Sequence, residues 1–283
     1  MSRYLKQHVL FFSTSLCVVA LTAGSLSAQG DTGFLRGKAK LDLSFSYTLD
    51  TYDHFWMGDH RVKDPGVGRV TRAGYSLWGA YGLLDELDLV AAGSWVVAST
   101  DGDAPFDRND DFQDAVLGVK YRLLSAPVDS SEFSLLVAPS VKFPLANYEE
   151  DDVTAIGDGQ TDYRGRIIGH FQLPSGMFVS LETGYDKRSG LPDDEVPVHL
   201  TAGITVLNSL TLTPYYSNVN SLDGIDIGEG PFPATEEDYE RVGIGAYLRV
   251  ADRIGVTGNV RTTVDGKNTG DVGGFSLGFV VSL

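Results

Sequence analysis

The sequence has almost no cysteine, no excess of basic residues and no apolar run long enough for a bundle of membrane helices. Its single cysteine excludes an intrachain disulfide. With 22 basic and 38 acidic residues, the formal net charge is −16. Binding to nucleic acid needs a basic surface, so no nucleic-acid partner is expected. A mean hydropathy of −0.05 is too polar for several membrane helices. It remains compatible with an outer-membrane β-barrel, whose strands alternate apolar and polar residues.

Residues 1–28 have the features of a secretory signal peptide. Arg3 and Lys6 precede a mostly apolar stretch, and Leu26 and Ala28 lie at the −3 and −1 positions of a cleavage site. A membrane anchor is the alternative, but polar residues interrupt the stretch. Since Cys17 would leave with this segment, the mature domain, residues 29–283, would contain no cysteine. The chain is therefore predicted to be exported.

A period of two recurs along most of the mature chain. In the first run, Leu41, Leu43 and Phe45 alternate with polar residues, as in a strand with one apolar face. Twelve such runs are present: 41–47, 73–81, 87–97, 115–123, 133–143, 163–171, 177–185, 196–206, 210–216, 242–250, 254–262 and 275–283. This pattern predicts an all-β fold.

The connections between these runs alternate between short turns and long loops. Together with the even count, this predicts an antiparallel up-and-down transmembrane β-barrel of about twelve strands, with both termini periplasmic. The apolar positions of the twelve runs, which we call the apolar phase, contain no Asp, Glu, Lys or Arg. A lipid-facing surface requires this, because Arg or Lys at the midplane costs about 2–4 kcal/mol. A soluble sandwich is the alternative, but it would not gather the long loops on one side. We therefore expect the outer membrane of a Gram-negative cell, with its lipid and lipopolysaccharide as partners.

Two prolines fall inside predicted strands, Pro139 and Pro214. A closed barrel has no edge strand to host a residue without an N–H group. Each proline is therefore expected at a bulge or at the end of a hydrogen-bonded ladder.

The opposite phase of the strands defines the predicted lumen, where basic residues outnumber acidic ones. The acidic positions are Asp42, Asp88, Asp114, Asp162, Glu182 and Asp186, and further basic positions are Lys40 and Arg72. Arg and Lys attract anionic solutes, and a tryptophan can stack on a ring. The predicted solute path consists of Lys120, Arg122, Lys142, Arg164, Arg166, Arg241, Arg249, Arg261 and Trp78. The alternative interpretation is that these charges pair with the acids and fill the barrel.

The loops contain acidic clusters at 101–111, 149–152, 193–195 and 236–238. A second hypothesis is therefore a closed structural or binding barrel whose loops bind cations, lipopolysaccharide or a protein partner. No cofactor and no metal site is predicted. The sequence does not predict an enzyme, since no nucleophile motif accompanies His170 and His199 of the predicted lumen. A lipid-modifying membrane enzyme is the remote alternative.

Three motifs resemble a family of outer-membrane transporters first named for a meta-pathway phenol-degradation protein. They are the stretches 118–124 (GVKYRLL), 141–144 (VKFP) and 157–163 (GDGQTDY). The resemblance covers roughly residues 87–187 and implies an outer-membrane barrel that takes up small, often hydrophobic or aromatic, solutes. It also implies the barrel-assembly machinery as a partner. Such barrels usually end in Phe, whereas this chain ends in Leu283, which keeps the apolar phase without the ring.

Overall fold

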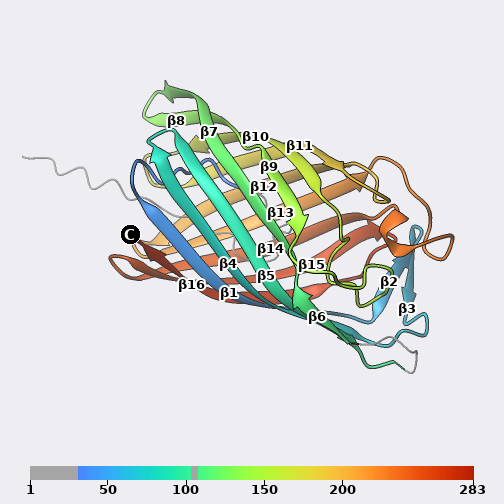
Figure 1. The fold of residues 1–283 in the computed structure, drawn as a ribbon. Coiled ribbons are helices and arrows are strands. Elements are labelled where there is room, and N and C mark those ends of the chain that lie inside the picture. The colour runs from blue at the N-terminus through green and yellow to red at the C-terminus, as the bar shows by residue number, and fades with distance from the viewer. Residues whose placement is uncertain (1–30, 103–107) are drawn as a thin grey trace, which may run out of the picture.

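The chain forms one closed antiparallel barrel of twelve strands in a computed structural model that describes residues 31–102 and 108–283 (Figure 1). The predicted signal peptide, residues 1–28, lies outside the described residues. The strands are β1 (Leu41–Tyr52), β4 (Val70–Leu84), β5 (Leu87–Thr100), β6 (Asn109–Phe112), β7 (Asp114–Val128), β8 (Ser131–Val137), β9 (Ser140–Pro144), β10 (Asp162–Gln172), β11 (Phe178–Arg188), β12 (Glu195–Leu207), β13 (Leu210–Ser221), β14 (Asp238–Ala251), β15 (Ile254–Lys267) and β16 (Gly273–Ser282).

Each barrel strand pairs with its neighbours in sequence, and β1 pairs with β16 to close the sheet. The short strands β6 and β9 extend β7 and β8, so each of these two pairs counts as one strand of the barrel. At the seam, Leu41 and Leu283 exchange two backbone hydrogen bonds, of 3.0 and 2.7 Å. The predicted barrel of about twelve strands is confirmed. Within the described residues, no helix is long and apolar enough to cross a membrane.

The two faces of the sheet follow the predicted phase. Leu77 and Leu277 point outward and are 58% and 57% exposed, whereas Ser44 and Ser217 point inward and are fully buried. The outward positions form an uncharged band around the barrel, which the hydrocarbon of a bilayer requires. All six predicted inner acids are buried: Asp42, Asp88, Asp114, Asp162, Glu182 and Asp186.

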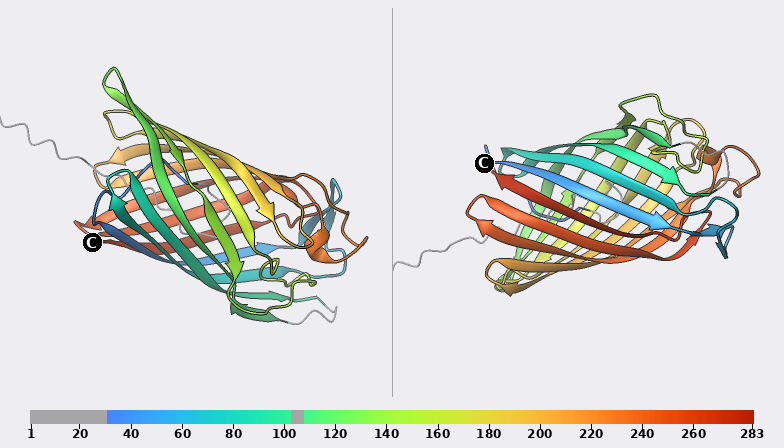
Figure 2. Two further views of the ribbon diagram at one scale, coloured as in Figure 1. Left: turned by 45° about the horizontal axis from the view of Figure 1, so that its top comes forward. Right: turned by 90° about the horizontal axis from the view of Figure 1, so that it is seen from below.

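The two ends of the barrel differ (Figure 2). The short turns lie at one end together with the C-terminus and the start of β1, while the long loops lie at the other end. Both ends of the barrel sheet are thus on the short-turn side, as predicted. The first long loop contains a hairpin of β2 (His54–Met57) and β3 (His60–Lys63), and the loop after β13 contains a 3-10 turn, η1 (Phe232–Ala234). The alternating pattern did not predict either element.

Pro139 occupies a break in its strand, as expected, whereas Pro214 lies inside the β13–β14 ladder opposite Ile244 and is unpaired only on its β12 side. Pro139 lies between β8 and β9, where the strand is interrupted. Pro214 lies in a gap of the β12–β13 ladder, between Leu212 and Tyr215, which pair with β12. A missing N–H is tolerated at these positions because no ladder bond is required of it.

Inward-facing glycines make room for large neighbours on adjacent strands. A methyl group at Gly203 would overlap the ring of Phe178, and one at Gly243 would overlap the ring of Tyr215. Because the barrel has only twelve strands, its interior is narrow, and a large side chain fits inside where the neighbouring inward position is a glycine, which has no side chain. These glycines therefore set how the lumen is filled.

A charged residue on the outer face should destabilise the barrel. We expect Leu277→Arg to lower the free energy of unfolding in lipid vesicles by about 2–4 kcal/mol, because the guanidinium would face hydrocarbon. Urea titration, followed by the gel mobility of folded and unfolded protein, measures this. The control Leu191→Arg lies in a loop outside the strands and should change little. Equal effects of the two substitutions would contradict a lipid-facing band.

Candidate functional site

The chain segment before β1, residues 31–40, enters the lumen at the short-turn end. Phe34 and Leu35 are buried although they belong to no strand. The Phe34 ring packs edge-on against Phe178, at 4.9 Å, and against His170, at 4.6 Å. We refer to residues 31–40 as the N-terminal segment. It partly occupies the short-turn end of any path through the barrel.

Charged side chains also hold the N-terminal segment in place. The ammonium of Lys120 donates to Asp31 Oδ1, at 3.0 Å, and to the carbonyl of Thr32, at 3.2 Å. The guanidinium of Arg36 forms an ion pair with Asp42, and its backbone N–H donates to Asp88 at 3.0 Å. All of these groups except Asp31 are buried. Removing one partner of a buried pair leaves an uncompensated charge, so these contacts fix the segment firmly.

A dense ionic network covers the inner wall formed by β7 and β9–β12. Lys142 Nζ lies 2.6 Å from Asp162, 2.8 Å from Asp158 and 3.5 Å from Asp114. Further along the wall, Arg164, Arg166 and Arg188 pair with carboxylates, in particular Asp162, Glu182, Asp186 and Glu195. In this sector the basic side chains of the predicted path are matched by acids.

The loop between β9 and β10, residues 145–161, is tied to this network. Asp158 lies in the loop and pairs with both Lys142 and Arg188. Burial opposes ionisation of Asp158, but these two cations outweigh it and hold the pKa of its carboxyl below the usual value. In the same loop the Tyr148 hydroxyl donates to Asp114. Burial and this carboxylate raise the pKa of the Tyr148 hydroxyl well above its usual value.

The remaining residues of the predicted path occupy different parts of the barrel. Arg261 is buried and pairs with Asp50, and Arg241 lies over the Tyr239 ring, 3.8 Å from its centroid. Arg249 is exposed near the short turns, where it donates to the carbonyl of Asn208 at 3.1 Å. The side chains of Arg122 and Trp78 are half-buried on inward positions. The path residues are therefore spread over the length of the lumen rather than gathered in one site.

The sequence analysis missed several charged groups of the interior. Asp50, Arg188 and Glu195 continue the inward phase beyond the predicted strand ends, so longer strands would have included them. Asp31, Arg36 and Asp158 belong to a terminal segment and a loop, and no periodicity marks them. The acids in this set, Asp31, Asp50, Asp158 and Glu195, outnumber the two bases, so they reduce the basic excess that the strand pattern predicted.

An apolar cluster covers the long-loop end of the lumen. It consists of Tyr52, Phe55, Val70 and Val153, and we call it the cap cluster. The β2–β3 hairpin positions Phe55 by pairing with the loop after β15, where Trp56 N–H donates to the Thr269 carbonyl at 2.8 Å. The outer end of the lumen is thus partly closed by folded loops.

The two lumen histidines bind serines on neighbouring strands. His170 Nδ1 lies 2.6 Å from Ser180 Oγ, and His199 Nδ1 lies 2.7 Å from Ser217 Oγ. All four side chains are buried, and His170 Nε2 has no hydrogen-bond partner among the described residues. A catalytic serine requires access and an acid that orients the histidine. These contacts instead join adjacent strands.

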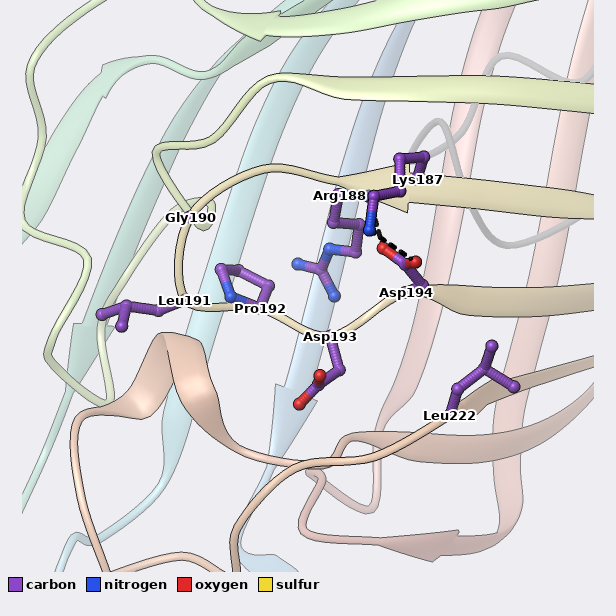
Figure 3. A pocket seen from close by; sticks show the side chains of 8 residues that line it. All are labelled: Lys187, Arg188, Gly190, Leu191, Pro192, Asp193, Asp194 and Leu222. Atoms are coloured by element: carbon purple, nitrogen blue, oxygen red, sulfur yellow. Dashed lines mark hydrogen bonds and ion pairs between the residues drawn. The ribbon is translucent and has the colours of Figure 1, made fainter.

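The long-loop end also holds a shallow pocket of about 230 Å³ (Figure 3). Its lining residues are Lys187, Arg188, Gly190, Leu191, Pro192, Asp193, Asp194 and Leu222. Lys187 donates to Asp194 at 2.9 Å, so these two charges satisfy each other. Within the described part of the loops, no three His, Cys, Asp or Glu side chains gather in a way that could hold a metal ion.

Comparison with known proteins identifies the family. Residues 27–279 match the family model described as "Putative MetA-pathway of phenol degradation". The chain belongs to this family. The match extends over nearly the whole chain from residue 27 onward, well beyond the stretch that suggested the resemblance. No curated protein matches the chain.

Solved structures confirm the fold of this family member. The COG4313 outer membrane channel from Pseudomonas putida F1 is similar with a TM-score of 0.72 and 15% sequence identity, over 90% of this chain and all of that one. The NanC porin is similar with a TM-score of 0.50 and 10% identity, over 86% of this chain and all of that one. The barrel thus has the fold of outer-membrane channels, and its uncharged exterior is consistent with a location in the outer membrane.

The ion pairs of Asp158 should stabilise the barrel only above acidic pH. Because its pKa is lowered in the folded state, this stabilisation is present above the ordinary carboxyl pKa and is lost as pH falls through the lower folded value. We expect Asp158→Asn to lower the melting temperature at pH 7 by several degrees. The difference from wild type should shrink below about pH 4. The exposed turn residue Asp252 provides the control Asp252→Asn, and a pH-independent difference would contradict the assignment.

Proposed function

We propose that this barrel passes small anionic or aromatic solutes across the outer membrane through its lumen. The observation that carries the proposal is the composition of the inner face. Basic and aromatic side chains occur along its length, many of the cations paired with carboxylates, while the outward positions in the middle of the strands carry no charge. The family description, which refers to phenol degradation, supports an aromatic solute.

The proposed path residues would act in two ways. Guanidinium groups bind carboxylates through two parallel hydrogen bonds, whereas an ammonium acts as a point charge. Aromatic rings such as Trp78 offer a stacking surface to a solute ring. A solute would therefore be guided by several weak contacts, which favours passage over tight binding. The residues proposed for this role are Lys120, Arg122, Lys142, Arg164, Arg166, Arg241, Arg249, Arg261 and Trp78.

The N-terminal segment would limit the rate of passage. Phe34, Leu35 and Arg36 occupy space at the short-turn end that a solute must cross. We expect deletion of residues 31–36 to raise the permeability of proteoliposomes to sodium benzoate several-fold. Swelling assays on the folded protein measure this, with the neutral disaccharide sucrose as a size control. The deletion does not remove any barrel strand.

The same assay can refute the proposal. A barrel that passes neither benzoate nor phenol, with or without residues 31–36, would not be a channel for these solutes. It would instead support the closed structural or binding barrel. One observation favours that second candidate: the N-terminal segment and the cap cluster fill opposite ends of the lumen. Conductance of the intact protein in planar bilayers distinguishes the two, because a closed barrel would give none.

A further inference from the structure

Three guanidinium groups belong to inward positions on strands that do not carry the ionic network. They belong to Arg72 of β4, Arg241 of β14 and Arg261 of β15, and we call them the arginine cluster. The strand register places them at neighbouring inward positions. Arg261 of β15 stands opposite Gly274 of β16, and Gly274 stands opposite Asp50 of β1. Asp50 in turn stands opposite Arg72 of β4. Gly243 of β14 stands opposite Arg261, and Arg241 is the next inward-facing residue of β14.

The arginine cluster has one carboxylate partner in the described part of the chain. Arg261 Nη2 donates to both oxygens of Asp50, at 2.6 and 2.7 Å. Arg72 stands directly opposite Asp50, and its buried Nε has no hydrogen-bond partner among the described residues. Arg241 contacts Thr263 Oγ1 at 3.4 Å and the Tyr239 ring. Of the three guanidinium groups, only that of Arg261 has an ion pair with a carboxylate among the described residues.

Gly274 allows the one ion pair to form. Asp50 and Arg261 lie on strands that are not adjacent, with β16 between them. The intervening inward position is Gly274, where a methyl group would overlap Asp50 Oδ1. The Asp50 carboxylate therefore reaches across the empty position to Arg261.

Tyrosines surround this arrangement. Arg241 lies over Tyr239, and the electrostatic neighbours of the Tyr215 hydroxyl are Arg261, Arg241 and Asp50. Tyr52 belongs to the cap cluster above, and its hydroxyl has Arg72, Arg241 and Asp50 among its electrostatic neighbours. The Tyr239 ring thus contacts the arginine cluster, and Tyr215 and Tyr52 lie within electrostatic range of it, as does the carboxylate of Glu237. A ring with a carboxylate attached matches both features.

We propose that the arginine cluster is a selectivity site for small aromatic carboxylates, in which Asp50 serves as an internal counter-ion that competes with the solute for Arg72 and Arg261. This inference rests on the proposed function, since it specifies the solute class of the same lumen. An arriving carboxylate would replace Asp50 at a guanidinium already freed of water. Asp50 would thereby keep the affinity low enough for release.

Equilibrium binding of sodium benzoate to the folded, detergent-solubilised protein tests the proposal without requiring transport. We expect Asp50→Asn to tighten benzoate binding roughly 3- to 10-fold, because Arg261 and Arg72 lose their competitor. Arg72→Gln should weaken binding by a similar factor, and it breaks no ion pair. Isothermal titration calorimetry measures both affinities, with gel mobility as the check of folding. Benzyl alcohol, a neutral analogue of similar size, should bind all variants equally.

A matched control removes a carboxylate elsewhere. Asp265 is exposed on the outer phase of β15, so Asp265→Asn should leave benzoate affinity unchanged. Affinities that do not differ between wild type, Asp50→Asn and Arg72→Gln would overturn the inference, even if the barrel passes benzoate. If the expected shifts are found but proteoliposomes show no benzoate permeation, the selectivity site stands and the transport function fails.

Discussion

The hydrocarbon core of a membrane offers no hydrogen bonds, so every backbone N–H and C=O that crosses it needs a partner within the protein. This chain meets the requirement by closing β1 onto β16, with Leu41 and Leu283 bonded at the seam. Closure then fixes the side chains, because alternate residues must face lipid or lumen. Since the lipid side excludes charge, the ionisable side chains of the barrel strands gather in the interior.

Placing so many charges in a narrow interior has a cost that the structure offsets by pairing. An unpaired buried charge is unfavourable, and a buried pair is favourable only with good geometry and further hydrogen bonds. Lys142 with three carboxylates, and Arg188 with Asp158 and Glu195, show this on one wall. The loop that contributes Asp158 is thereby held against the barrel.

The lumen is consequently not uniform. Phe34 and Leu35 lie at the short-turn end together with the ion pairs of Asp31 and Arg36, further charged groups follow along the barrel, and the cap cluster lies at the long-loop end. Across the middle, the two walls differ, since carboxylates accumulate around Lys142 while Asp50 alone is ion-paired to the arginine cluster within the described residues.

The sequence by itself determined the number of barrel strands and the face on which the side chains of the twelve alternating runs lie. It could do so because a period of two translates directly into lipid-facing and lumen-facing positions, as Leu277 and Glu182 illustrate. Only the tertiary structure decided the partners of the lumen charges. The contacts of Asp31 with Lys120 and of Asp50 with Arg261 join residues far apart in sequence. Alternation says that such residues point inward, but the register across closed strands and the path of non-periodic segments decide which of them meet.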